Sequence, residues 1–189
     1  MAIEYEIVVY KIYPLLVIMC YNIIGVAFMT NFEIKKHTCC FSGHRKISKS
    51  EILNVKQRLS EAIISAIKDG YCFFGTGGAL GFDTLAAQTV LDLKKNYPNI
   101  RLILVLPCLS QTRNWKAADI SEYERIKKKA DKVVYTSKEY TRDCMFKRNR
   151  HLVDNSSLCI CYLKEQSGGT AYTVKYATAH GLNVHNIAL

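Results

Sequence analysis

The chain has 189 residues, of which 49% are apolar and 22% are charged, and its formal net charge is +10. This composition is typical of a globular protein and excludes a disordered, collagenous or coiled-coil chain. The positive charge favours anionic partners such as nucleotides, nucleic acids or lipid head groups, and the length suits one domain with an extension.

The first 28 residues differ from the remainder. An uncharged run from Ile12 to Met29 is long enough to span a bilayer, and basic residues follow it, so a spanning helix would leave the rest of the chain in the cytoplasm. The acidic start argues against a secretory signal. We favour a dispensable extension over residues 1–28 and a working domain over residues 29–189, with a membrane anchor and an extra packed element as the alternatives.

From residue 37 onward, short apolar strands alternate with amphipathic helices. The pattern predicts strands over residues 37–42, 71–74, 100–106, 132–135, 157–163 and 183–187, and helices over residues 48–68, 83–96, 119–130, 142–154 and 169–180. Ser48 and Glu51 predict a capping box at the first of these helices, and Gly70 predicts its end. The alternation predicts an α/β fold, a Rossmann-like three-layer α/β/α arrangement with a mainly parallel sheet.

The eight cysteines predict no disulfide framework. Most of them lie in or beside apolar runs, and no Cys-x-x-Cys pair occurs. We therefore expect reduced core thiols in a cytoplasmic protein. No motif predicts a metal site or a cofactor.

Two glycine-rich turns join strands to helices, and ligands of parallel sheets bind beyond the carboxyl ends of the strands. The turns are Gly75-Thr76-Gly77-Gly78-Ala79-Leu80-Gly81 and Ser167-Gly168-Gly169-Thr170. Glycines there leave backbone N–H groups free to bind an anion at a helix N-terminus, which points to a phosphate-bearing ligand. The first turn is neither a dinucleotide fingerprint nor a Walker A loop, and a tight connection is its plainer explanation.

Four polar or aromatic side chains near these turns each allow two roles. Asp83 is a helix N-cap or a partner of a ribose hydroxyl. Arg45 pairs with a phosphate or is solvated, and His44 donates to a ligand, acts as an acid or base, or is solvated. Trp115, the single Trp, stacks on a base or staples its loop.

Four segments, in this order, resemble the YpsA-like branch of the SLOG superfamily, which includes the DNA-processing protein DprA and the Lonely-guy (LOG) phosphoribohydrolases. They are S-G-H-R, G-G-A-L-G-F-D-T-L-A-A, R-N-R-H-L-V-D-N-S-S-L-C-I and S-G-G-T-A-Y-T-V-K-Y-A. The resemblance covers residues 37–187, and Trp115 and Tyr123 stand where the branch usually shows a Trp and a Tyr. It implies a Rossmann-like fold that binds a nucleotide-derived ligand between the glycine turns.

The resemblance supports binding more than catalysis. Thr173 stands where the LOG enzymes carry their catalytic Glu, although Arg148 matches their Arg. One alternative is a nucleoside-phosphate hydrolase that uses another carboxylate, Asp83 or Asp154. A second alternative is a DprA-like binder of single-stranded nucleic acid. SLOG domains commonly self-associate, so a homodimer is a further expectation.

We therefore predict a protein that binds a nucleotide-derived small molecule, for example as a sensor, and we assign no catalytic residue. A bulky residue at Gly78 or Gly169 should abolish ligand binding with little loss of folding. Trp115 is the candidate for base stacking. The predicted ligand contacts are Gly43, His44, Arg45, Gly77, Gly78, Gly81, Asp83, Arg148, Asn149, Ser167, Gly168, Gly169 and Thr170.

Overall fold

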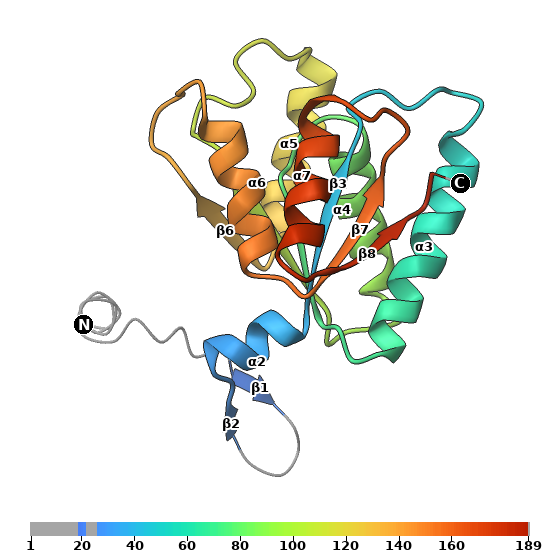
Figure 1. The fold of residues 1–189 in the computed structure, drawn as a ribbon, viewed down its shortest axis with the longest axis vertical. Coiled ribbons are helices and arrows are strands. Elements are labelled where there is room, and N and C mark those ends of the chain that lie inside the picture. The colour runs from blue at the N-terminus through green and yellow to red at the C-terminus, as the bar shows by residue number, and fades with distance from the viewer. Residues whose placement is uncertain (1–18, 22–25, 189) are drawn as a thin grey trace.

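A six-stranded sheet forms the centre of the computed structural model, which describes residues 19–21 and 26–188 (Figure 1). The strands lie in the order β6-β5-β4-β3-β7-β8, and every neighbouring pair is parallel. They are β3 (Thr38–Gly43), β4 (Phe73–Thr76), β5 (Arg101–Leu106), β6 (Lys132–Tyr135), β7 (Leu158–Tyr162) and β8 (Asn183–Asn186). Each predicted strand is present with ends shifted by a few residues, and the Rossmann-like fold is confirmed.

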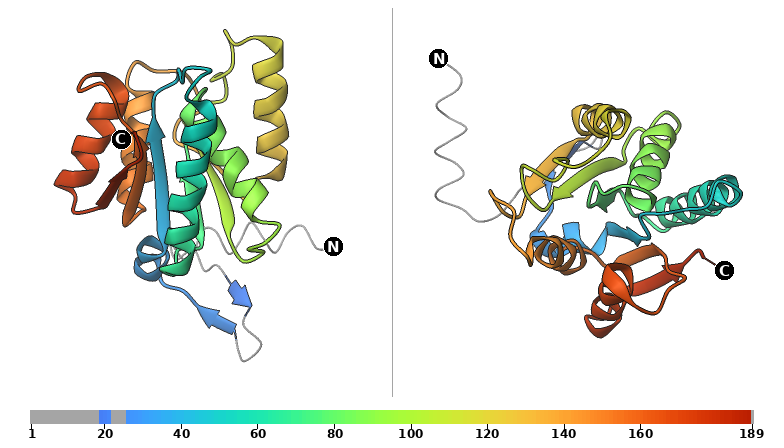
Figure 2. Two further views of the ribbon diagram at one scale, coloured as in Figure 1. Left: turned by 90° about the vertical axis from the view of Figure 1, so that its right-hand side faces the viewer. Right: turned by 90° about the horizontal axis from the view of Figure 1, so that it is seen from above.

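Helices cover both faces of this sheet (Figure 2). One face carries α3 (Ile52–Lys68), α4 (Phe82–Leu93) and α5 (Ala117–Lys129), and the other carries α6 (Cys144–Asp154) and α7 (Gly168–Ala179). The chain runs outward from β3 to β6 and then crosses back to place β7 on the other side of β3. Because parallel crossovers are right-handed, this reversal moves the later helices to the opposite face.

Two apolar cores fill the space on either side of the sheet. Under α3, α4 and α5 the core includes Leu59, Val90 and Leu104, and under α6 and α7 it includes Cys40 and Val153. The cysteines whose side chains the structure describes are free thiols. Most of them are buried and pack as small apolar side chains, which agrees with the expected core role.

The ends of α3 show one correct and one wrong prediction. The helix begins at Ile52, and the Ser48 hydroxyl donates to the Glu51 carboxylate at 2.7 Å, so the predicted capping box does not form. The carboxylate also pairs with Lys164 in the loop after β7. At the other end Gly70 has a φ of +90° and closes the helix as predicted.

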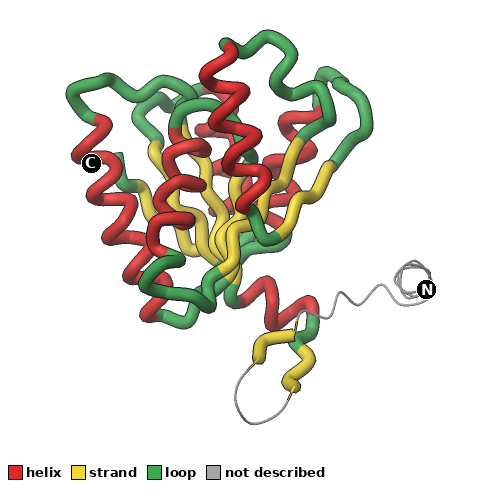
Figure 3. The backbone as a smooth tube through the Cα atoms, turned by 180° about the vertical axis from the view of Figure 1, so that it is seen from behind, coloured by secondary structure: helices red, strands yellow, loops and turns green. Residues whose placement is uncertain are grey.

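The part of the N-terminal segment that the structure describes contains two short strands and a short helix (Figure 3). Strands β1 (Met19–Tyr21) and β2 (Val26–Phe28) pair antiparallel, and α2 (Asn31–Lys36) leads into β3. The sequence patterns did not predict these elements. None of the helices within residues 26–188 is both long and apolar enough to cross a membrane. Residues 1–18 and 22–25 of the predicted extension lie outside the described residues, and the domain boundary at residue 29 stays a prediction.

Candidate functional site

A cavity of about 320 Å³ lies over the carboxyl ends of β3 and β7. This is the place where the strand order reverses, which is where open parallel sheets bind their ligands. The lining residues are Phe41, Ser42, Gly43, His44 and Arg45 at and after the end of β3, Ala79 and Asp83 beside α4, Met145, Arg148, Asn149 and Leu152 from α6, and Gly169 and Thr170 from α7. Eight predicted contact residues therefore come together here from four separate segments.

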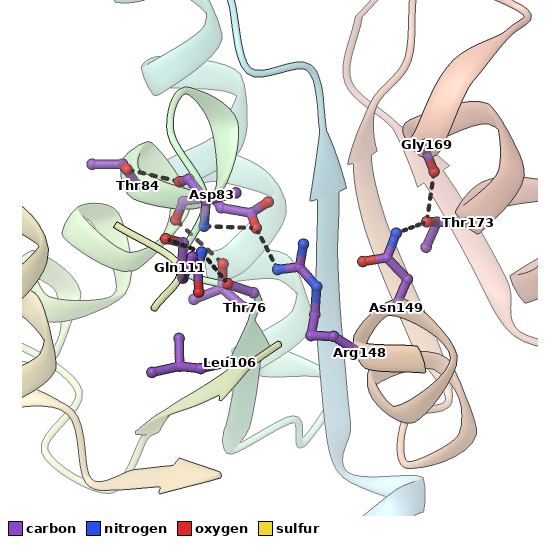
Figure 4. A network of polar contacts seen from close by, with 12 residues as sticks. Thr76, Asp83, Thr84, Leu106, Gln111, Arg148, Asn149, Gly169 and Thr173 are labelled. Carbon is purple, nitrogen blue, oxygen red and sulfur yellow. Dashed lines mark hydrogen bonds and ion pairs between the residues drawn. The ribbon is translucent and has the colours of Figure 1, made fainter. Parts of the chain in front are cut away.

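Arg148 and Asp83 form a buried ion pair at one side of the cavity (Figure 4). Arg148 Nη1 lies 3.2 Å from Asp83 Oδ2, and the two residues are 5% and 6% exposed. Burial raises the pKa of Asp83 and lowers the pKa of Arg148, and the charge of each partner opposes the shift of the other. Asp83 Oδ2 also accepts the Ala79 N–H at 3.2 Å, whereas Gly81 occupies the N-cap position of α4. Asp83 therefore fixes Arg148 and the preceding turn and is not the N-cap.

The absence of a side chain at Gly77 leaves the space that the Arg148 guanidinium occupies. A Cβ atom at Gly77 would lie 1.1 Å from Arg148 Nη1, so any side chain there would displace the guanidinium. Arg148 Nε is buried and has no hydrogen-bond partner among the residues that the structure describes. The first glycine turn therefore accommodates an arginine, one of whose buried donors has no partner among the described residues.

Packing also explains the other glycines of the first turn. Gly78 has a φ of +61°, and a Cβ atom there would lie 2.8 Å from Leu106 Cδ2. Gly81 has a φ of +76°, and its Cβ would lie 2.3 Å from the Arg45 carbonyl oxygen. Gly77, Gly78 and Gly81 do not line the cavity. A bulky residue at Gly78 would strain the fold, so Gly78 cannot test ligand binding as the sequence suggested.

The second glycine turn is open. Neither Gly168 nor Gly169 has any atom within 4 Å of the position of an added Cβ, and no side chain caps α7. The first amides of a helix lack intrahelical acceptors, so this turn presents free donors to an anion. Gly169 and Thr170 line the cavity, whereas Ser167 and Gly168 precede it in the turn.

Thr173 links α7 to α6 beneath this open turn (Figure 4). Its hydroxyl donates to the Gly169 carbonyl at 2.8 Å and accepts from Asn149 Nδ2 at 2.7 Å. The residue is 2% exposed. Thr173, predicted to stand at the position of the LOG glutamate, therefore links the two helices and holds Asn149 in place.

The His44 ring makes contacts that the sequence did not predict. Its Nε2 accepts the backbone N–H groups of Lys164 at 2.9 Å and Glu165 at 3.2 Å. Because Nε2 is an acceptor, the ring proton lies on Nδ1. The His44 ring thus fixes the loop after β7 and leaves a single N–H available to a ligand. Arg45 beside it is exposed, and no hydrogen bond or ion pair joins its side chain to the described residues.

Trp115 takes the second of its two predicted roles, whereas Gln111 has a role that the sequence did not predict. Trp115 packs against the core and meets Tyr123 edge to face, with ring centroids 5.5 Å apart, so it staples its loop and does not reach the cavity. Gln111 is buried, and its Nε2 donates to the carbonyls of Gly77 at 3.3 Å and Gly78 at 3.0 Å. It therefore shapes the first glycine turn from the loop after β5.

The remaining lining residues were missed because they are apolar or small. Met145, Arg148, Asn149 and Leu152 share one face of α6, at the spacing of three, four and seven residues that a helix requires. This spacing around Arg148 was the signal that could have predicted Met145 and Leu152. Among the described residues, no group of three or more His, Cys, Asp or Glu side chains is placed to hold a metal ion.

The reversed strand order at β3, the cavity above it and the glycine turns beside it define a Rossmann-like domain with a candidate ligand site at the point of reversal. The particular family follows from comparison with known proteins. The YpsA family model, described as the YspA SLOG family, matches residues 40–188, and the chain belongs to this family.

Relatives support this assignment over most of the domain. A UPF0398 protein of Bacillus cereus (strain ATCC 14579) is 31% identical over 130 residues, which cover 67% of this chain and 71% of the relative. The UPF0398 protein YpsA of Bacillus subtilis (strain 168) is 27% identical over 121 residues, which cover 62% of this chain and 67% of the relative.

Two solved structures of DNA processing protein A (DprA) share the fold. The protein from Streptococcus pneumoniae matches with a TM-score of 0.58 at 18% identity, over 80% of this chain and 50% of that chain. The protein from Helicobacter pylori, whose structure is described as giving its single-stranded DNA binding mode, matches with a TM-score of 0.57 at 15% identity, over 82% of this chain and 66% of that chain. This chain thus spans about half the length of the S. pneumoniae protein, and at these identities the likeness shows the fold alone.

Proposed function

We propose that the chain binds a nucleotide-derived small molecule in the cavity over β3 and β7. The observation that carries the proposal is the convergence of Arg45, Arg148 and the uncapped start of α7 on one cavity of about 320 Å³. Small-molecule sites are concave and of this size, with few polar groups to orient the ligand.

In this proposal the phosphate lies at the start of α7. The free amides of Gly169 and Thr170 donate to it, and Arg45 approaches from the other side of the cavity with no competing partner. Apolar lining from Phe41 and Met145 contacts the less polar part of the ligand. Thr173 offers no acid or base, because its hydroxyl is engaged on both sides, so we infer binding without hydrolysis of the LOG type.

Thermal unfolding of the full chain against a panel of nucleotides tests this proposal. The panel contains nucleoside monophosphates, cyclic nucleotides, NAD and ADP-ribose. A ligand at 100 times its Kd stabilises the native state by about 2.7 kcal/mol, which raises the Tm by about 5–10 °C for a domain of this size. A panel that leaves the Tm unchanged throughout contradicts the proposal.

Variants then locate the ligand. Gly169→Trp fills the cavity from a position with open space around it, and Arg45→Ala removes an exposed cation, so both should fold and lose most of the shift. Lys46→Ala is the matched control, because Lys46 is the next residue, equally basic and exposed, and does not line this cavity. A shift that survives Gly169→Trp would place the ligand elsewhere.

A second candidate function is the binding of single-stranded nucleic acid. The shared fold with the H. pylori protein and the net charge of +10 favour it. Retention of a labelled oligonucleotide at low salt, with an affinity that falls steeply as salt is added, would support this function. Failure to retain any oligonucleotide at low salt would contradict this second function.

A further inference from the structure

A second cavity, of about 340 Å³, lies near the opposite end of the sheet. It is enclosed by α2, by α6 and by the edge of the sheet that ends in β6, elements that Figure 1 shows close together. Thr38 and Lys132 line it, and they are the first residues of β3 and β6. The cavity therefore opens at the amino ends of the strands, whereas the candidate nucleotide site lies over their carboxyl ends. Leu152 of α6 lines both cavities and separates them.

The floor of this second cavity is apolar. Ile103 and Val105 of β5 and Val134 of β6 line it from the sheet, and Leu152 lines it from α6. Gly75 of β4 adds depth, because a Cβ atom there would lie 3.0 Å from Leu152 Cδ2. A ligand that enters the cavity therefore meets hydrocarbon over most of its length.

Two lysines and a histidine stand around this floor. Lys35, Lys132 and His151 line the cavity, and no Asp or Glu is among its lining residues. Two neutral polar side chains are already engaged: Thr38 Oγ1 donates to the Ile34 carbonyl at 2.5 Å, and Ser156 Oγ donates to the Leu152 carbonyl at 2.8 Å. Asn155 Nδ2 donates to the His151 carbonyl at 2.8 Å, and Asn31 is the other neutral polar residue of the lining. The charged groups that can recognise a ligand are therefore the two lysines.

Lys132 is the cation in this cavity whose charge most needs an anionic partner. It is half-buried, and among the described residues no hydrogen bond or ion pair reaches its ammonium group. Burial lowers the pKa of Lys132, and burial together with the charge of Lys132 lowers the pKa of His151, which Asp154 opposes. A charge held partly out of water without a partner is costly, and an anion beside it would offset that cost.

We propose that this cavity binds a small amphipathic carboxylate, with its hydrocarbon part on Ile103, Val105 and Val134 and its carboxylate at Lys132. The two ends of the ligand match the two parts of the cavity, an apolar floor and a cationic rim without acidic residues. The site is separate from the proposed nucleotide site, so either can be occupied or absent without the other.

Calorimetric titration of the full chain with octanoate tests this proposal, with 1-octanol and inorganic phosphate as matched probes. Octanoate should bind saturably, and 1-octanol, which has the same tail without the charge, should bind at least tenfold more weakly, as should phosphate. NMR signals of the His151 ring should shift as octanoate is added, because the ring lines the cavity.

Lys132→Met keeps the apolar stem of the lysine and removes its charge, and it should weaken octanoate binding at least tenfold. Lys128→Met is the control, because Lys128 is an exposed lysine of α5, which covers the other face of the sheet. Octanoate binding that is absent, that 1-octanol equals or that Lys132→Met leaves unchanged would overturn the proposal. The comparison of octanoate with 1-octanol needs no variant, so it decides the question even where Lys132→Met does not fold.

Discussion

Arg148 joins the candidate site to the core of the domain. Its guanidinium occupies the space above Gly77 and pairs with Asp83 from a segment 65 residues away, and the residue lines the cavity. A buried charge is tolerated because its partner and its hydrogen bonds remain in place, so the loss of either partner alone should be costly.

We therefore predict strong coupling between these two residues. Arg148→Met and Asp83→Leu should each reduce the free energy of unfolding by about 3–5 kcal/mol, because each leaves a buried charge unpaired. The double variant should lose at least ~1 kcal/mol less than the sum of the single losses, because it removes both charges. Urea unfolding of the four proteins measures the cycle. Lys147→Met, at the exposed neighbouring position, should change stability by less than ~0.5 kcal/mol, and additive losses would contradict the coupling.

The sequence could predict both residues but not their pairing. Arg148 and Asp83 belong to motifs that resemble the family, and each was predicted as a separate contact to the ligand. Their mutual contact depends on the distance between α6 and the first glycine turn, which is a property of the packed sheet and not of either motif. The engagement of His44 Nε2 by two amides of a distant loop was hidden from the sequence for the same reason.

At the scale of elements, the two glycine-rich turns require glycine for different physical reasons, although both join a strand to a helix. The first turn packs against Arg148, Leu106 and the backbone of Arg45, and the Asp83 carboxylate accepts its Ala79 amide. The backbone carbonyl of His44 accepts the amide of Phe82, the first residue of α4. The second turn has empty space at both glycines and an uncapped helix behind it. Glycine in the first turn is therefore required by packing. In the second turn the φ of +85° favours glycine at position 168, and Gly169 leaves the cavity open.

Substitution by alanine at one glycine of each turn distinguishes these two reasons for glycine. Gly77→Ala should cost about 3 kcal/mol or more, because the new Cβ displaces the guanidinium and breaks the ion pair. Gly169→Ala should leave stability within about 1 kcal/mol of the wild type, on the stabilising side, because it meets no atom and alanine favours the helix. Urea unfolding measures both variants. Equal stability for the two would show that packing does not separate the turns.

At the scale of the whole molecule, some elements of the fold could be predicted from local sequence patterns and others could not. Apolar periodicity predicted the six strands of the sheet and the five long helices because each buries one face or both. It did not predict α2, which is short and has no buried residue, or the pairing of β1 with β2. Strand order was likewise not read from the pattern, since the return from β6 to the far side of β3 depends on the packing of α6 across the sheet.

That strand order predicts a gradient of local stability across the sheet. Every residue of β4 and β7 is buried, as is nearly all of β3, and these strands have a neighbour on each side. Strands β6 and β8 lie at the edges, and their residues are only partly buried or exposed. An edge strand can open without unfolding the core, whereas β3 is released only by global unfolding. Hydrogen exchange measured by mass spectrometry should therefore show the paired amides of β6 and β8 exchanging at least tenfold faster than those of β3, β4 and β7. Protection of β6 as strong as that of β4 would mean that the sheet opens as a single unit.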